Sequence, residues 1–151
     1  MAVIVSVTIK NLPEIKRVFN EMPAKMTREL GKAVERVILK IEGDAKKLAP
    51  VNKQSGGGNL RQSIKSFMRG AASGVVDVGA GYGIFVHEGT RPHIIRVVNK
   101  RVLANKRMGQ IFGKVVHHPG TKANPFLQNA VDSNSAFIDR QFEQAVDNVI
   151  K

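Results

Sequence analysis

The stretch His118-Pro119-Gly120-Thr121-Lys122-Ala123-Asn124-Pro125-Phe126-Leu127 connects two predicted elements of different kinds. Pro119-Gly120 is a turn pair, because proline fixes its own φ and glycine takes the positive φ that closes a tight turn. Asn124-Pro125 is a helix start, because Asn is a preferred N-cap and Pro fits the first helical position. We therefore predict that a strand through Val115-Val116 is turned here. A helix then leaves from Phe126-Leu127, whose side chains point back into the core.

The N-terminal third is predicted to hold a strand and one long helix. Residues 2–10 alternate in polarity, which indicates a strand, and a capping-box-like start at Asn11 begins a short helix that Pro23 interrupts. Beyond it, apolar residues recur at three- and four-residue steps with basic residues on the other side. This pattern predicts an amphipathic helix of about 25 residues, ended by Pro50. Its apolar face consists of Met26, Leu30, Ala33, Val34, Val37, Ile38, Ile41, Ala45 and Leu48.

The segment after this helix is predicted to be a loop followed by a hairpin. Residues 51–59 lack an apolar period and contain Gly56-Gly57-Gly58, which favours a flexible loop. No Gly-Lys-Ser/Thr follows the glycines, so a phosphate-binding loop is the weaker interpretation. A short turn from Leu60 then runs into a strand. A hairpin turn at residues 70–74 leads to a second strand through residues 75–78.

A glycine-rich stretch at residues 79–83 precedes the most basic part of the chain. It is not a dinucleotide-binding fingerprint, because the third glycine of that pattern would fall at position 84, which is Ile. We expect these glycines to let backbones pass closely or to form a bulge. Residues 84–88 are predicted to be extended, and residues 89–93 to form another turn.

The remaining chain is predicted to form a basic ribbon and a terminal helix. The basic ribbon, residues 91–118, contains two β-rich runs at residues 94–98 and 111–116. The segment between them, residues 99–107, is basic and poor in strand signals, so we expect a long arm with a mobile tip. The final helix starts at about Pro125 and has a possible break near residues 133–135.

The charge of the chain is concentrated in its middle. The net charge is +12, and residues 46–122 alone hold fourteen basic side chains against two acidic ones. Such a field favours a polyanion or an acidic protein surface as partner, although a solvated basic face is the alternative. The chain has no Cys, which excludes disulfides and thiolate metal sites. The apolar N-terminus is too short for a membrane span.

Catalytic and metal-binding patterns are weak. His87 and Glu88 are neighbours in a predicted strand, so we expect their side chains to point to opposite faces. The elbow G-x-S-x-G and the metal motif H-E-x-x-H are both absent from the sequence. We expect His118 to be held by local hydrogen bonds instead. The sequence therefore predicts no enzyme activity, no cofactor and no metal site.

Non-specific nucleic-acid binding is a stronger alternative. Basic side chains of the middle segment can neutralise phosphates without reading sequence. Stacking is less well supported, because Phe67, Tyr82, Phe85 and Phe112 are the only aromatic candidates in this region, and we expect most of them to be buried. The predicted assembly or DNA contacts are Lys53, Arg61, Arg96, Lys100, Arg101, Lys106, Arg107 and Lys114. The predicted structural joint consists of Gly89, Pro119, Gly120, Asn124, Pro125 and Phe126.

The order of these motifs resembles a known family. Residues 82–93 (Tyr-Gly-Ile-Phe-Val-His-Glu-Gly-Thr-Arg-Pro-His), the basic ribbon, residues 118–127 and a terminal helix resemble tail-completion (head–tail joining, neck) proteins of long-tailed bacteriophages and prophages. Ala49-Pro50 followed by residues 59–64 is similar to that family's segment after the long helix. The loop at residues 55–59 departs from the family's tighter Thr-Gly turn. The resemblance covers residues 25 to 151.

The resemblance implies an α+β fold within one domain, residues 1–151. A twisted antiparallel sheet would pack against the long N-terminal helix and the C-terminal helix. The resemblance also implies a ring, commonly a hexamer in the virion, whose subunits can be monomers when isolated. Its partners would be further copies of itself, the tail tube protein and the head-closure or connector protein, with genomic DNA passing through. The location would be the head–tail junction, reached from the host cytoplasm, and no membrane would be involved.

Overall fold

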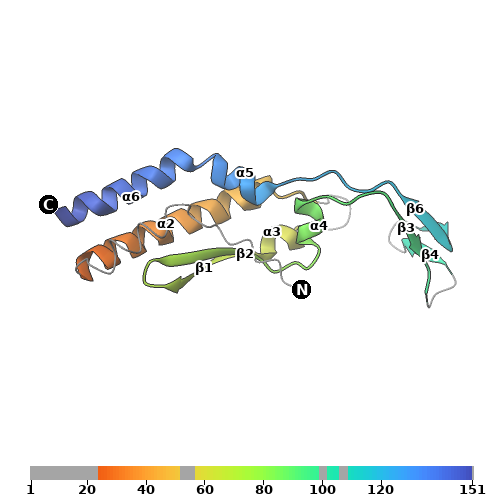
Figure 1. Ribbon diagram of the computed structural model, residues 1–151. Helices are drawn as coiled ribbons and strands as arrows, with labels where there is room; N and C mark the ends of the chain where they lie inside the picture. The colour runs from red at the N-terminus through yellow and green to blue at the C-terminus, as the bar shows by residue number, and fades with distance from the viewer. Residues whose placement is uncertain (1–23, 52–56, 99–101, 106–108, 151) are drawn as a thin grey trace.

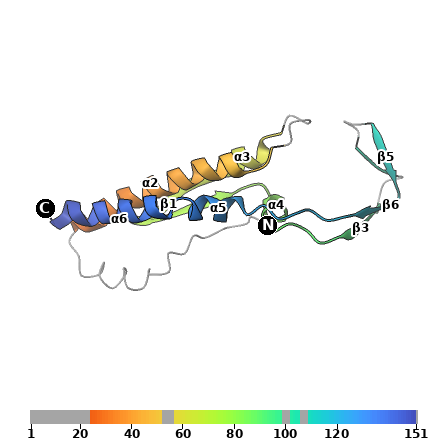
Figure 2. The ribbon, with the colours of Figure 1, turned by 90° about the horizontal axis from the view of Figure 1, so that it is seen from above.

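A computed structural model describes residues 24–51, 57–98, 102–105 and 109–150. It confirms the predicted α+β class (Figure 1). A body of helices and one β-hairpin occupies one end of the molecule, and a thin pair of chain segments runs from it to small sheets at the other end (Figures 1 and 2). The predicted first strand, the short helix before Pro23 and most of the loop at 51–59 lie outside the described residues.

The long helix α2 spans Ala24–Leu48, as its apolar period predicts. Its buried residues repeat at the three- and four-residue steps seen in the sequence, because one stripe of an amphipathic helix faces the core. After Pro50, the short helix α3 (Asn59–Ser63) leads directly into a strand. None of the described helices is long and apolar enough to cross a lipid bilayer.

The hairpin of β1 (Ile64–Gly70) and β2 (Ser73–Val78) lies against α2. The two strands are antiparallel, with Ile64 opposite Val78, and the turn falls at Ala71-Ala72, within the predicted residues 70–74. A Cβ atom on Gly31 of α2 would overlap the carbonyl oxygen of Ala71. Glycine at position 31 therefore lets the hairpin turn approach the helix backbone.

Two C-terminal helices cover another side of α2 (Figure 1). Helix α5 spans Phe126–Asp132 and α6 spans Ser135–Ile150, so the predicted break near residues 133–135 is confirmed. Buried Asn134 lies at this break and donates from Nδ2 to the Ala130 carbonyl at 2.8 Å and to Asp44 Oδ2 at 3.0 Å. Its amide thus fixes the break and ties it to α2.

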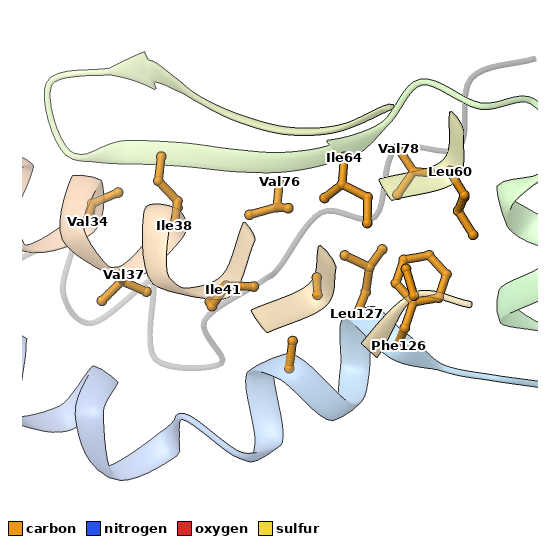
Figure 3. Close-up of a cluster of buried hydrophobic side chains, with 13 residues drawn as sticks. Val34, Val37, Ile38, Ile41, Leu60, Ile64, Val76, Val78, Phe126 and Leu127 are labelled. Carbon is orange, nitrogen blue, oxygen red and sulfur yellow. The ribbon is translucent and has the colours of Figure 1, made fainter. Parts of the chain in front are cut away.

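The core lies between α2, the hairpin and α5 (Figure 3). Its most buried large side chains are Phe126, Ile41, Ile64 and Val76, which come from all three of these parts. Phe126 is fully buried and Leu127 is 3% exposed, so the prediction that both point into the core is confirmed. A second, smaller cluster joins the N-terminal half of α2 to α6 through Met26, Leu30, Ala33 and Ala145.

The prediction of an extended segment at residues 84–88 is wrong. Gly83–His87 forms a short helix, α4, and Glu88 N donates to the Ile84 carbonyl at 2.8 Å. The β-branched and aromatic residues favour a strand, but tertiary contacts override that weak preference. A Cβ on Gly83 would lie 2.7 Å from Val78 Cγ1, so glycine lets α4 start against the end of β2.

Candidate assembly surface

In the part of the ribbon nearest the body, the two chain segments run antiparallel in one register. Strand β3 (His93–Arg96) pairs with β6 (Val115–His118), with His93 opposite His118. The same register continues outward, where Val97 N donates to the Lys114 carbonyl at 3.1 Å. It also continues toward the body as a bridge between Thr90 and Thr121.

The predicted turns at Pro119-Gly120 and at residues 89–93 are therefore wrong. Both segments pass straight along the ribbon instead of reversing, and Asn124 N still donates to the Val86 carbonyl at 3.0 Å beyond them. The shared register places Pro92 opposite Pro119. Neither proline has an N–H to donate, so the ladder is interrupted there without the chain turning.

Glycine is needed on both sides of the ribbon at its base. Gly89 has φ +75° and Gly120 has φ +89°, values that L side chains rarely adopt. A Cβ on Gly89 would lie 2.5 Å from the carbonyl oxygen of Thr121. A Cβ on Gly120 would overlap the carbonyl oxygen of Thr90. The positive φ expected at Gly120 is thus present, but it serves a close approach of two backbones and not a tight turn.

Two stacked histidines follow this narrow base. The rings of His93 and His118 lie 4.9 Å apart between centroids at an interplanar angle of 30°. His118 Nδ1 accepts a hydrogen bond from Gly120 N at 3.1 Å, which confirms the predicted local hydrogen bond. His93 Nδ1 lies 2.9 Å from the Arg91 carbonyl. Among the described residues, no three His, Cys, Asp or Glu side chains gather to hold a metal ion.

A second hairpin forms the outer end of the ribbon. Strand β4 (Leu103–Asn105) pairs with β5 (Gln110–Gly113), although residues 99–107 were expected to lack strand structure. Gly113 has φ +90°, and the hairpin bends away from the direction of β3 and β6 (Figures 1 and 2). The three residues of β4 are too few to show an alternating pattern, so cross-strand pairing decides their conformation.

The described part of the ribbon exposes large apolar side chains. Val98, just beyond β3, is 89% exposed, and Ile111 of β5 is 73% exposed, although antiparallel sheets commonly pack one face on a core. The prediction that most aromatics of this region are buried is also wrong, because Phe67, Tyr82, Phe85 and Phe112 are all exposed. No apolar side chain among the described residues of the ribbon is buried. The other exposed members are Ile94, Ile95, Val102 and Val115.

The helix at the joint begins at Phe126, as predicted, but its predicted N-cap is wrong. Pro125 occupies the N-cap position of α5, and no side chain caps the helix, so Asn124 is not the N-cap. The carbonyl of Asn124 accepts from Phe126 N at 2.8 Å instead, while Asn124 N is held by Val86.

His87 connects α4 to this joint. Its ring contacts Phe126 edge-on, with centroids 5.5 Å apart, and its Nδ1 lies 2.7 Å from Glu88 Oε1. The prediction that His87 and Glu88 point apart is therefore wrong. In a helix end, unlike a strand, successive side chains do not lie on opposite faces.

The predicted contact residues fall into three groups. Arg96 and Lys114 lie on the exposed ribbon, as predicted. Arg61 instead donates from Nε to the Ala49 carbonyl at 3.0 Å and from Nη2 to that of Lys47 at 3.2 Å, so it satisfies carbonyls at the end of α2. The others, Lys53, Lys100, Arg101, Lys106 and Arg107, lie outside the described residues.

Ion pairs among the described residues are confined to the body. Apart from His87 and Glu88, all of them join side chains along α2. Hydrogen bonds from Lys40, Lys47 and Asn134 hold the pKa of Asp44 well below its usual value. Burial raises the pKa of Glu42, but hydrogen bonds from Lys46 and Ser66 outweigh it and lower that pKa overall. The basic side chains of the ribbon have no such partners among the described residues.

Comparison with protein families, curated proteins and solved structures finds no match for this chain. In the part of the chain that the structure describes, the ribbon combines basic side chains, exposed apolar side chains and unpaired strand edges.

Proposed function

We propose that this chain is a structural virion protein, a tail-completion or neck component that assembles into a ring between the tail tube and the head connector. One observation carries the proposal. The basic ribbon extends away from a packed body and exposes apolar side chains that nothing in the described chain covers (Figure 1). Exposed apolar patches on a protein surface mark interaction sites.

The backbone of the ribbon supports the same proposal. A two-stranded sheet leaves an outer edge on each strand, and such edges accept a further strand from another chain. In the described residues, β3 and β6 pair only with each other, and β4 pairs only with β5. The ribbon therefore offers backbone hydrogen-bonding groups as well as apolar anchors, which is the combination that interlocked subunits use.

The partners proposed are those that the resemblance implies. Further copies of the chain form the ring, commonly a hexamer, and isolated subunits can be monomers before they assemble. The tail tube protein meets one face and the head-closure or connector protein meets the other, while genomic DNA passes through the opening. The protein acts at the head–tail junction of the virion by shape and assembly, without enzyme activity or cofactor.

Particles made by the genome that encodes the chain test this proposal. Immunogold labelling in the electron microscope is expected at the head–tail junction, and labelling anywhere else contradicts the proposal. Ile111→Asp on the ribbon is expected to leave unjoined heads and tails, because it places a charge in the contact surface. Leu39→Asp, at a position on α2 that is 56% exposed, serves as the matched control and should give normal particles.

A second candidate function is non-specific nucleic-acid binding through the middle segment. The exposure of four aromatic rings favours it, since exposed rings can stack on bases. The Arg69 guanidinium lies 5.7 Å from the centroid of the Phe67 ring, so cation and ring already share one surface. This function predicts that affinity for DNA falls steeply as salt rises. Affinity that barely changes between low and moderate salt would count against it.

A further inference from the structure

The described charge of the ribbon is unpaired. Residues 91–118 hold no acidic side chain, and the three basic residues described there, Arg91, Arg96 and Lys114, take part in no ion pair. Its exposed aliphatic side chains, such as Ile94 and Ile111, cannot stack on bases. They fit a protein surface better than a nucleic acid. A partner of this ribbon is therefore an acidic protein surface with apolar atoms.

The outer face of α6 has that chemistry. Asp139, Glu143 and Asp147 recur every four residues, so they form one stripe along the helix, and all three are exposed. Gln141 and Ala145, which are buried, lie on the opposite side. No described ion pair includes a residue of the stripe. Val146, beside the stripe, is 38% exposed and adds apolar surface.

This stripe belongs to a negatively charged part of the chain. Residues 126–150 hold four acidic side chains and one basic side chain. A basic ribbon is repelled by the basic surfaces of α2, so electrostatic complementarity selects α6 among the surfaces that a second copy presents.

We propose that described residues of the basic ribbon of one copy, 91–98 and 109–118, dock on the acidic outer face of α6 in a second copy. The ribbon lies at one end of the molecule and the C-terminal end of α6 at the other, so the two surfaces do not meet within one chain (Figures 1 and 2). A contact between different surfaces is heterologous, and such contacts close into rings when the rotation permits. The inference rests on the proposed function, because it names the surface through which ring subunits meet.

Charge reversal tests the docking. Self-association of the full chain is measured by analytical ultracentrifugation at low salt for wild type, Glu143→Lys and Glu35→Lys. Both substitutions change the charge equally at exposed helical positions, but only Glu143 lies in the stripe. We expect Glu143→Lys to weaken association by at least about tenfold and Glu35→Lys to change it by less than about threefold. Lys114→Glu combined with Glu143→Lys is expected to restore association, which a merely misfolded variant would not do.

Cysteine cross-linking tests the geometry, since the chain contains no Cys of its own. Proteins carrying Val115→Cys on the ribbon and Glu143→Cys on α6 are mixed and oxidised. A mixed disulfide dimer is expected, and Lys65→Cys, at an exposed position near the start of β1, should not replace Glu143→Cys in forming it.

The outcomes separate this inference from the proposed function. Association that resists Glu143→Lys, or a mixed disulfide that forms equally well with Lys65→Cys, overturns the docking. The docking is also overturned if the chain stays monomeric and gives no mixed disulfide. It is likewise overturned if Lys114→Glu abolishes binding to a DNA duplex but leaves self-association unchanged. In each of these cases, immunogold labelling at the head–tail junction still supports the proposed function, and labelling elsewhere rejects it.

Discussion

Replacement of Phe126 by alanine tests how much this buried side chain, which lies where the ribbon joins the body, contributes to the free energy of unfolding. Phe126 is the first residue of α5 and is fully buried between α2, the hairpin and His87. A buried phenylalanine removes about 150 Å² or more from water, which at about 25 cal/mol per Å² corresponds to about 4 kcal/mol. Measured losses for Phe→Ala in protein cores are about 3–5 kcal/mol, in agreement with this value.

Urea unfolding followed by circular dichroism gives the measurement. With a slope of about 2 kcal/mol per M, a loss of about 4 kcal/mol lowers the midpoint by about 2 M. Phe85→Ala is the matched control, because Phe85 lies close by on α4 but is 58% exposed. It should change the free energy of unfolding by less than about 1 kcal/mol. The role of Phe126 as a stabilising core residue is refuted if the two variants lose the same free energy of unfolding, or if Phe126→Ala loses less than about 1 kcal/mol.

Three further predictions concern the base of the ribbon, the loss of stability at low pH and the end of α2. Gly120→Ala is expected to speed amide hydrogen exchange at Thr121 far more than Gly109→Ala does. Both glycines have positive φ, but only Gly120 also faces a backbone oxygen, that of Thr90. Equal effects would exclude the close approach of the two backbones as the cause. The carboxyls of Glu42 and Asp44 have lowered pKa values when folded, so their contribution to stability is complete above about pH 4.5 and is lost as the pH falls through the folded pKa values. The melting temperature of Glu42→Gln should therefore fall less than that of wild type between pH 5 and about pH 3, and parallel curves would contradict this. Arg61→Ala should cost about 1 kcal/mol in urea unfolding because two carbonyls at the end of α2 lose their donor, and no loss would show that water replaces the guanidinium.

Much of the body was predictable from local sequence. The apolar residues of α2 repeat at three- and four-residue steps from Met26 to Ala45, and a pattern of that length is satisfied by a helix alone. The hairpin turn at residues 70–74 and the break before Ser135 also came from local signals, namely small residues between two apolar runs. These features involve neighbours in the chain, so the sequence contains most of the information that decides them.

The candidate surface was predicted less well, because its features depend on distant partners. The exposure of Phe112 and Ile111 could not be read from residue type, since apolar residues are ordinarily expected inside. The five residues of α4 are too few to show a helical period, and their β-branched side chains favour a strand. Arg61 was counted among charged contacts, although its donors lie on carbonyls twelve and fourteen residues earlier in the chain.

The sequence by itself determined the α+β class, the long amphipathic helix, the divided C-terminal helix and the concentration of positive charge in the middle of the chain. Tertiary structure alone decided what Pro119-Gly120 does. A proline followed by a glycine with positive φ is compatible with a turn and with a close pass of two strands, and the choice depends on whether another backbone lies alongside. Thr90 supplies that backbone, 31 residues before its partner Thr121, and so the chain continues along the ribbon where local signals favoured a reversal.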